Sequence, residues 1–194
     1  MTQLILASAS KSRGDLLRGA GLNIETIPAD LDEEIIKAEG LPVVETAIKL
    51  SKAKAAHISK HYPQAYVIGA DQMMECDGLR FDKPTSREKA REQLQFLRAK
   101  THHLISAVSL YKDNDCLWSH HQMAELEMRR FSDAFLESYL DQIGNDVMTT
   151  VGGYRLEEMG VQLFNRIEGD YFTILGLPLL AVLAFLRSRD MIDK

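Results

Sequence analysis

Asp71 is the residue whose type and position point most directly to chemistry, because it follows the apolar run at residues 66–70. Such a run predicts a buried strand, and ligands of α/β sheets bind beyond the carboxyl ends of strands. A carboxylate delivered there could hold a cation or activate a water molecule. Gly69 and Ala70 are small enough to let a ligand approach the backbone. The alternative is an aspartate that only stabilises a turn.

Two basic residues fall on the apolar faces of predicted helices. On a helical wheel Lys54 lies between Ala47 and Leu50, and Arg13 precedes Leu16 by about one turn. An ammonium group buried in such a stripe must find an anion or lose its charge. The alternatives are a partly exposed stripe edge for Lys54 and a snorkelling side chain for Arg13.

The loop after the first predicted strand combines hydroxyl and basic side chains. In sequence order these are Ser8, Ser10, Lys11, Ser12 and Arg13. A helix is predicted to begin here, and a helix N-terminus offers unpaired N–H groups and the positive end of a dipole. The loop therefore suits a phosphate group. The alternative is that the serines cap their own helix.

An acidic cluster follows the second predicted strand and contains Asp30, Asp32, Glu33 and Glu34. Oxygen ligands without nitrogen or sulfur suit Mg²⁺ or Mn²⁺. The alternative is a solvated acidic loop. The histidine pairs at 102–103 and 120–121 match no metal-binding motif, and we interpret them as structural or surface residues.

Strands and helices alternate along the predicted chain, which indicates an α/β fold with a mixed sheet. Strands are expected at residues 4–7, 24–27, 66–70, 104–111, 117–128 and 163–167, with a small hairpin over 73–81. A first helix is expected after the serine-containing loop, with its apolar face at Leu16, Leu17 and Ala20. Further helices are expected over 43–62, 85–97, 132–142 and from 178 onward, the one at 85–97 opened by a capping box at Thr85 and Glu88.

Bulk composition excludes several classes of protein. The 194 residues carry a formal net charge of −5, which disfavours a nucleic-acid or anionic-membrane binder. Cys76 and Cys116 have no zinc spacing and predict two free thiols. The start lacks a basic signal-peptide region, and the most apolar stretch, residues 174–186, is too short to span a bilayer. We therefore expect one cytoplasmic domain over residues 1–194.

The ordered set of segments resembles the Maf family (septum-formation proteins) over nearly the whole chain. The matching stretches are Leu4-Ile-Leu-Ala-Ser-Ala-Ser with Arg13 and Leu16-Leu17, Asp30-Leu-Asp-Glu33, Leu50 through Lys54-Ala55, Val67-Ile-Gly-Ala-Asp71, Lys83-Pro84, Thr101-His102, Gly152-Gly-Tyr154 through Gly160, and Arg166-Ile-Glu-Gly-Asp170 through Gly176-Leu-Pro178.

The resemblance implies a two-lobed, inosine-triphosphatase-like α/β fold with a nucleotide cleft between the lobes. It implies hydrolysis of a nucleoside triphosphate to the monophosphate and pyrophosphate, with a divalent cation (Mg²⁺ or Mn²⁺) and Asp71 as catalytic carboxylate. The other matching pocket positions are Ser8, Arg13, Glu33, Lys54 and Lys83, and Ser10 belongs to the same first loop. The three basic residues would hold the triphosphate, and Glu33 and Asp71 the cation.

Two further positions bear on the base. Gln72 and Glu157 match the branch that resembles 7-methyl-GTP pyrophosphatases, although Ser12 stands where that branch often has an aromatic residue. The substrate expected is thus a small modified nucleotide rather than dTTP or UTP, with neither nucleic acid nor membrane as partner and a homodimer left open.

Two other functions are open. One is a nucleotide-binding regulator of cell division without significant catalysis, since the family is also associated with division arrest. The other is a house-cleaning pyrophosphatase of the inosine-triphosphatase type, which would share the reaction class.

Overall fold

The computed structural model describes residues 3–193 and has the expected α/β fold. Its strands are β1 (Leu4–Ala7), β2 (Ile24–Thr26), β3 (Tyr66–Cys76), β4 (Leu79–Phe81), β5 (Thr101–Lys112), β6 (Asp115–Met128) and β7 (Phe164–Glu168). Its α-helices are α1 (Lys11–Gly19), α2 (Glu33–Lys37), α3 (Val43–Ser59), α4 (Arg87–Leu97), α5 (Asp133–Ile143), α6 (Tyr171–Ile174) and α7 (Leu179–Ser188). Short 3₁₀ helices occupy Gly144–Met148, Val151–Gly153 and Met159–Leu163.

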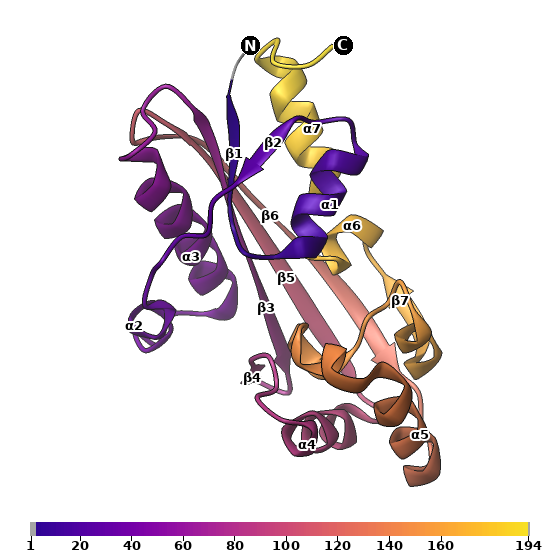
Figure 1. The fold of residues 1–194 in the computed structure, drawn as a ribbon. Coiled ribbons are helices and arrows are strands. Elements are labelled where there is room, and N and C mark those ends of the chain that lie inside the picture. The colour runs from indigo at the N-terminus through magenta and orange to yellow at the C-terminus, as the bar shows by residue number, and fades with distance from the viewer. Residues whose placement is uncertain (1–2, 194) are drawn as a thin grey trace. The chain divides into compact units, whose positions relative to one another are not determined.

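The sheet is mixed, as the sequence predicts. The strand order is β2-β1-β3-β5-β6-β7, with β4 paired to β3 (Figure 1). β1 runs parallel to β2 and β3, whereas the β3/β4 and β6/β7 pairs are antiparallel. The parallel part gives the sheet carboxyl ends at which ligands of α/β proteins bind.

The chain divides into two compact units. The first contains the described residues of Met1–Gln72, Ile105–Gln122 and Asp170–Lys194, and the second contains Met73–Leu104 and Met123–Gly169. The expectation of a single domain with a cleft between two lobes stays a prediction.

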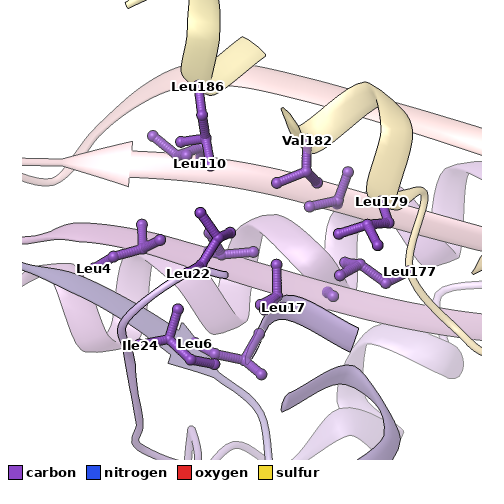
Figure 2. Close-up of a cluster of buried hydrophobic side chains, with 13 residues drawn as sticks. Leu4, Leu6, Leu17, Leu22, Ile24, Leu110, Leu177, Leu179, Val182 and Leu186 are labelled. Carbon is purple, nitrogen blue, oxygen red and sulfur yellow. The ribbon is translucent and has the colours of Figure 1, made fainter. Parts of the chain in front are cut away.

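β1 is buried on both faces, so it organises the core of the first unit. Leu4 and Leu6 join a cluster that includes Leu17 of α1 and Val182 of α7 (Figure 2). The other two residues of β1 face Ala55 and Ile58 of α3. Because side chains alternate along a strand, α1 and α7 cover one face and α3 the other (Figure 1).

In the second unit, an ion pair connects α4 to α5, and a buried polar pair connects His102 of β5 to Tyr154. Arg91 of α4 makes two hydrogen bonds to Glu137 of α5, at 2.5 and 2.9 Å, and these lower the pKa of Glu137 to about 2. His102 and Tyr154 are buried and lie 2.7 Å apart, Nε2 to Oη. The interpretation of His102 as structural is therefore confirmed.

Three local expectations were wrong, and two short helices were missed. β3 continues to Cys76, so Asp71 lies inside a strand rather than at its end; β5 is the neighbour of β3 in the sheet, and β4 pairs with Met74 to Cys76. Ser86, not Thr85, caps α4, since its hydroxyl accepts the Lys89 N–H. α3 ends three residues before Tyr62. The short helices α2 and α6 were not predicted, because one turn is too short to show periodicity.

Cys76 and Cys116 are both free, as predicted. Among residues 3–193, no helix combines the length and apolar character needed to cross a membrane.

Candidate active site

Lys54, Asp71 and Glu33 form an ion-pair cluster in the first unit. Lys54 Nζ lies 2.6 Å from Asp71 Oδ1 and 2.8 Å from Glu33 Oε1. Lys54 and Asp71 are only 8% and 5% exposed. The prediction that an ammonium within this apolar stripe must find an anion is confirmed, and it has two.

Close packing of α3 on β3 brings Lys54 to Asp71. A Cβ atom at Gly69 would lie 2.1 Å from the Ser51 carbonyl oxygen and 2.6 Å from the Ala55 nitrogen. Gly69 and Asp71 point to the same face of β3, because strand side chains alternate. The expectation that Gly69 leaves room for a ligand was wrong, since α3 fills that space.

The position of Asp71 in the sheet still suits ligand binding. Ala7 and Gly69 are the last residues paired between β1 and β3. Asp71 thus lies just beyond the carboxyl end of the parallel pair, although its own strand continues. This is where α/β proteins bind ligands, so the argument from strand ends holds for β1 rather than for β3.

Glu33 reaches the cluster because it opens a one-turn helix. Asp32 caps α2 by accepting the Glu34 N–H at 3.1 Å. Glu34 turns instead to Lys37, at 2.9 Å. In the described structure Glu33 is the member of the acidic cluster that contacts Lys54, and the other members line a solvated surface.

Arg13 is hydrogen-bonded to the backbone of the residue that precedes Asp71. Its Nη1 donates to the Ala70 carbonyl at 3.0 Å and to Ser8 Oγ at 3.3 Å, and its Nε donates to the Gly176 carbonyl at 2.8 Å. Ser8 is itself buried. Arg13 is therefore a fixed guanidinium rather than a snorkelling one, and the hydrogen bonds from Nε and Nη1 set its orientation.

The serine loop does cap its own helix. Ser10 Oγ accepts the Arg13 N–H at 3.4 Å at the start of α1. Ser8 Oγ accepts the Ser10 N–H, and Ser12 Oγ donates to the Leu175 carbonyl at 2.9 Å. The capping alternative is confirmed for Ser10, whereas phosphate binding by this loop stays a prediction.

Burial is the largest cause of the pKa shifts of Asp71 and Arg13. It raises the pKa of Asp71, and Glu33 raises it further, while the charges of Lys54 and Arg13 act to lower it. Burial also lowers the pKa of the Arg13 guanidinium, against the carboxylates of Asp71 and Glu33. The two cations and two anions cancel, so this cluster has no net charge to attract a polyphosphate.

Gln72 has partners that were not foreseen. Its Nε2 donates to Ser106 Oγ at 3.1 Å and to the Thr173 and Ile174 carbonyls at 3.1 and 3.0 Å. Its predicted role in lining a base pocket stays a prediction. One sequence feature indicated the helix whose carbonyls Gln72 bonds. The spacing Asp170-x-x-Thr173 is typical of an N-cap, and Asp170 does open α6.

Lys83 and Glu157 belong to the second unit, whereas the ion-pair cluster belongs to the first. Lys83 is exposed, between β4 and α4. The Glu157 carboxylate lies 3.3 Å from Arg155 Nε, and Glu158 of the same turn lies 2.9 Å from Arg155 Nη1. Both sequence-predicted residues are thus at positions that a solute can reach.

Within the described residues, no group of three or more histidine, cysteine, aspartate or glutamate side chains is arranged to hold a metal ion. Glu33 and Asp71 nevertheless direct oxygens at one point, the Lys54 ammonium. Mg²⁺ is commonly bound by only one or two carboxylates with water and substrate phosphate oxygens. A carboxylate pair therefore fits the predicted cation.

Comparison with known families decides the affiliation of the chain. Residues 3–189 match the model of the family described as Maf-like protein. The chain belongs to the Maf family.

Relatives of this Maf chain carry related names. A protein of Granulibacter bethesdensis, 48% identical over 97% of this chain and 98% of its own, is named "Nucleoside triphosphate pyrophosphatase". One from Paramagnetospirillum magneticum, 49% identical over 95% and 97%, has the same name. A protein of Brucella abortus, 43% identical over 98% of each chain, is named "7-methyl-GTP pyrophosphatase".

Among solved structures, a nucleoside-triphosphatase (dITP/XTP pyrophosphatase) of Mycobacterium abscessus aligns with 97% of the Maf chain and 98% of its own. Its sequence identity is 13% and its TM-score 0.46.

Proposed function

We propose that this Maf chain hydrolyses nucleoside triphosphates to nucleoside monophosphates and pyrophosphate, with Asp71 as the carboxylate that receives a proton from the attacking water. The observation that carries the proposal is the buried cluster in which Lys54 holds Asp71 and Glu33 while Arg13 stands beside them. The names of full-length relatives support the same reaction class.

In the proposed reaction, water oxygen bonds to phosphorus, the bond between the α and β phosphoryl groups breaks, and pyrophosphate leaves. Asp71 orients the water and takes its proton, which its raised pKa favours. Arg13 and Lys54, together with Lys83 as the family resemblance implies, neutralise the phosphates as charge moves to the leaving group. Ser8 and Ser10 lie in the loop nearest Arg13.

A divalent cation fits this chemistry, because the four cluster charges cancel and a triphosphate needs added positive charge. Glu33 and Asp71 would hold Mg²⁺ or Mn²⁺, directly or through water. When bound, such a cation lowers the pKa of a coordinated water and neutralises phosphate charge. Lys54 holds the two carboxylates close together, with its ammonium 2.6 Å from Asp71 and 2.8 Å from Glu33.

The test is hydrolysis of a nucleotide panel with Mg²⁺ or Mn²⁺, comparing wild type with Asp71→Asn. The variant keeps the side-chain size and removes the base, so turnover should fall by roughly 100-fold or more. A variant that keeps more than about a tenth of wild-type turnover removes Asp71 from the mechanism.

The same variant distinguishes the enzyme from a nucleotide-binding regulator. A carboxylate pair repels phosphate, so it hinders a pure binder and is useful only with a cation or a water to activate. If the chain only binds nucleotide, wild type should show no turnover and Asp71→Asn should bind nucleotide as tightly or more tightly.

For the base, we propose a preference for 7-methyl-GTP or a similar modified purine over dTTP and UTP, with Glu157 accepting the N1–H and the exocyclic amino group of guanine. The name of one relative supports this choice. Glu157→Gln should lower kcat/KM for 7-methyl-GTP relative to UTP by about tenfold or more. Glu158→Gln is the matched control, because it also loses a partner of Arg155.

A further inference from the structure

Four consecutive backbone carbonyls at the end of α6 each accept a side-chain hydrogen bond. Thr173 O receives Gln72 Nε2 and Ser106 Oγ, and Ile174 O receives Gln72 Nε2. The next two carbonyls receive Ser12 Oγ and Arg13 Nε. The last carbonyls of so short a helix lack i+4 backbone donors, although Thr173 O also accepts the Gly176 N–H at 3.0 Å, so these side chains help to hold the segment in place.

Gln72 makes the largest share of these bonds. Its Nε2 lies within 3.1 Å of two carbonyls and of Ser106 Oγ, whose own proton goes to Thr173 O. Carbonyl groups only accept, so the amide must present its nitrogen to them. Without Gln72, the Thr173 carbonyl would keep the Ser106 hydroxyl and the Gly176 N–H as donors, whereas the Ile174 carbonyl would lose the side-chain donor that it has in the described structure.

The segment held by Gln72 in turn holds Arg13. Gly176 has a φ of +100°, and a Cβ atom there would lie 3.3 Å from Arg13 Nε and 3.7 Å from Gln72 Oε1. The Gly176 carbonyl accepts the Arg13 Nε–H at 2.8 Å. A guanidinium is planar, so fixing Nε and Nη1 also fixes where Nη2 points.

We propose that Gln72 is a positioning residue for phosphate binding: it anchors the Thr173–Ile174 carbonyls, so that the Gly176 carbonyl orients the Arg13 guanidinium. The inference rests on the proposed function in that Arg13 is taken to bind phosphate. It assigns Gln72 to the phosphate end of the substrate, and Gln72 variants should weaken binding equally whatever the base.

Inorganic tripolyphosphate tests this inference, because it carries phosphates and no base. Its Kd, measured by calorimetry with Mg²⁺ present, should rise about tenfold in Gln72→Met, the effect of losing one to two net hydrogen bonds. KM for UTP and for 7-methyl-GTP should rise by the same factor, with kcat changed less. Ser106→Ala, which removes one donor to the same carbonyl, should move tripolyphosphate binding in the same direction.

Gln122→Met is the matched control, since Gln122 accepts the Thr173 hydroxyl proton at 3.1 Å and anchors no carbonyl of this segment. It should leave the Kd unchanged. A double-mutant cycle with Arg13→Lys should be non-additive, because the two residues act through one contact.

Three results would overturn the proposal. The first is unchanged tripolyphosphate binding with an altered ratio between UTP and 7-methyl-GTP, which would make Gln72 a base reader. The second is additive effects of Gln72→Met and Arg13→Lys. The third is a wild type that does not bind tripolyphosphate. A wild type that binds it without hydrolysing any nucleotide refutes the proposed function alone, and the binding comparison still decides the role of Gln72.

Discussion

At the scale of single residues, Lys54 is the centre of the candidate site. One ammonium group lies within 2.8 Å of two carboxylates that come from α2 and β3. Removing either carboxylate changes the charge felt by the other. Lys54 lowers the pKa of Asp71 and Glu33 raises it, so the two neighbours act in opposite directions on the proposed base.

Because Lys54 and Glu33 act in opposite directions on the pKa of Asp71, removing each charge should shift the pH dependence of catalysis in opposite directions. The proposed base works ionised, so kcat/KM should rise with pH through the pKa of Asp71. Lys54→Gln removes a charge that lowers this pKa and should move the acid limb to higher pH. Glu33→Gln removes a charge that raises it and should move the limb to lower pH. The pH dependence of kcat/KM at fixed Mg²⁺ concentration measures both shifts.

Lys52→Gln is the control, because Lys52 lies two residues away on α3, outside the ion-pair cluster. Its acid limb should match that of wild type. Two variants that shift in the same direction would mean that the limb does not report Asp71.

The sequence predicted some of these residues for physical reasons and others only by resemblance. Lys54 stood out because helical periodicity puts it in an apolar stripe. Glu33 was one of four similar acidic residues until α2 oriented it. The bonds of Gln72 to α6 join residues about 100 positions apart, and no local pattern encodes such a pairing.

At the scale of elements, Gly69 sets the approach of α3 to β3. Ser51 and Ala55 of the helix backbone fill the position that a side chain would take. Lys54 belongs to the same turn, so the glycine controls both packing and the ion pair. Glycine adds nothing to a hydrophobic pattern, so the sequence did not reveal this contact. The space beside Gly69 was therefore predicted to admit a ligand.

Gly69→Ala should therefore destabilise the fold and slow turnover together. A Cβ atom 2.1 Å from a backbone oxygen cannot be relieved by a rotamer change, so α3 must shift. Overpacking of this kind costs about 1–3 kcal/mol. Urea unfolding and kcat/KM measure the two effects. Gly19→Ala is the control, since nothing lies within 4 Å of its added Cβ; equal stability of the two variants would contradict the packing argument.

The connection from α4 to β5 contains a strained residue. Ala99 has a φ of +60°, a left-handed conformation that favours glycine. Ala99→Gly should therefore raise the free energy of unfolding by about 0.5–1 kcal/mol, net of the extra chain entropy of glycine. Chemical denaturation measures the difference. A variant less stable than wild type would mean that the alanine side chain contributes packing that outweighs the strain.

At the scale of the whole molecule, some stretches that match the Maf family are far apart in the sequence but contact each other in the fold. Thr101-His102 and Gly152-Gly-Tyr154 meet in the second unit through the bond between His102 and Tyr154. Element order and the mixed sheet were predictable because hydrophobic periodicity encodes them. Strand ends were not, because pairing with neighbouring strands, including β4 at Met74 to Cys76, extends β3 past its apolar run.

His102 makes the stability of the molecule depend on pH. Burial lowers its pKa from 6.5 to about 4, so the folded chain keeps the imidazole neutral where an unfolded chain would protonate it. The stabilisation is complete above about pH 6.5 and is lost as pH falls towards 4, by up to about 3 kcal/mol. Urea unfolding followed by circular dichroism at pH 4.5–7.5 should show this slope. His102→Gln, which can still bond Tyr154, should flatten it, whereas exposed His61→Gln should not. A His102→Gln variant with the wild-type slope would mean that other groups cause the acid sensitivity.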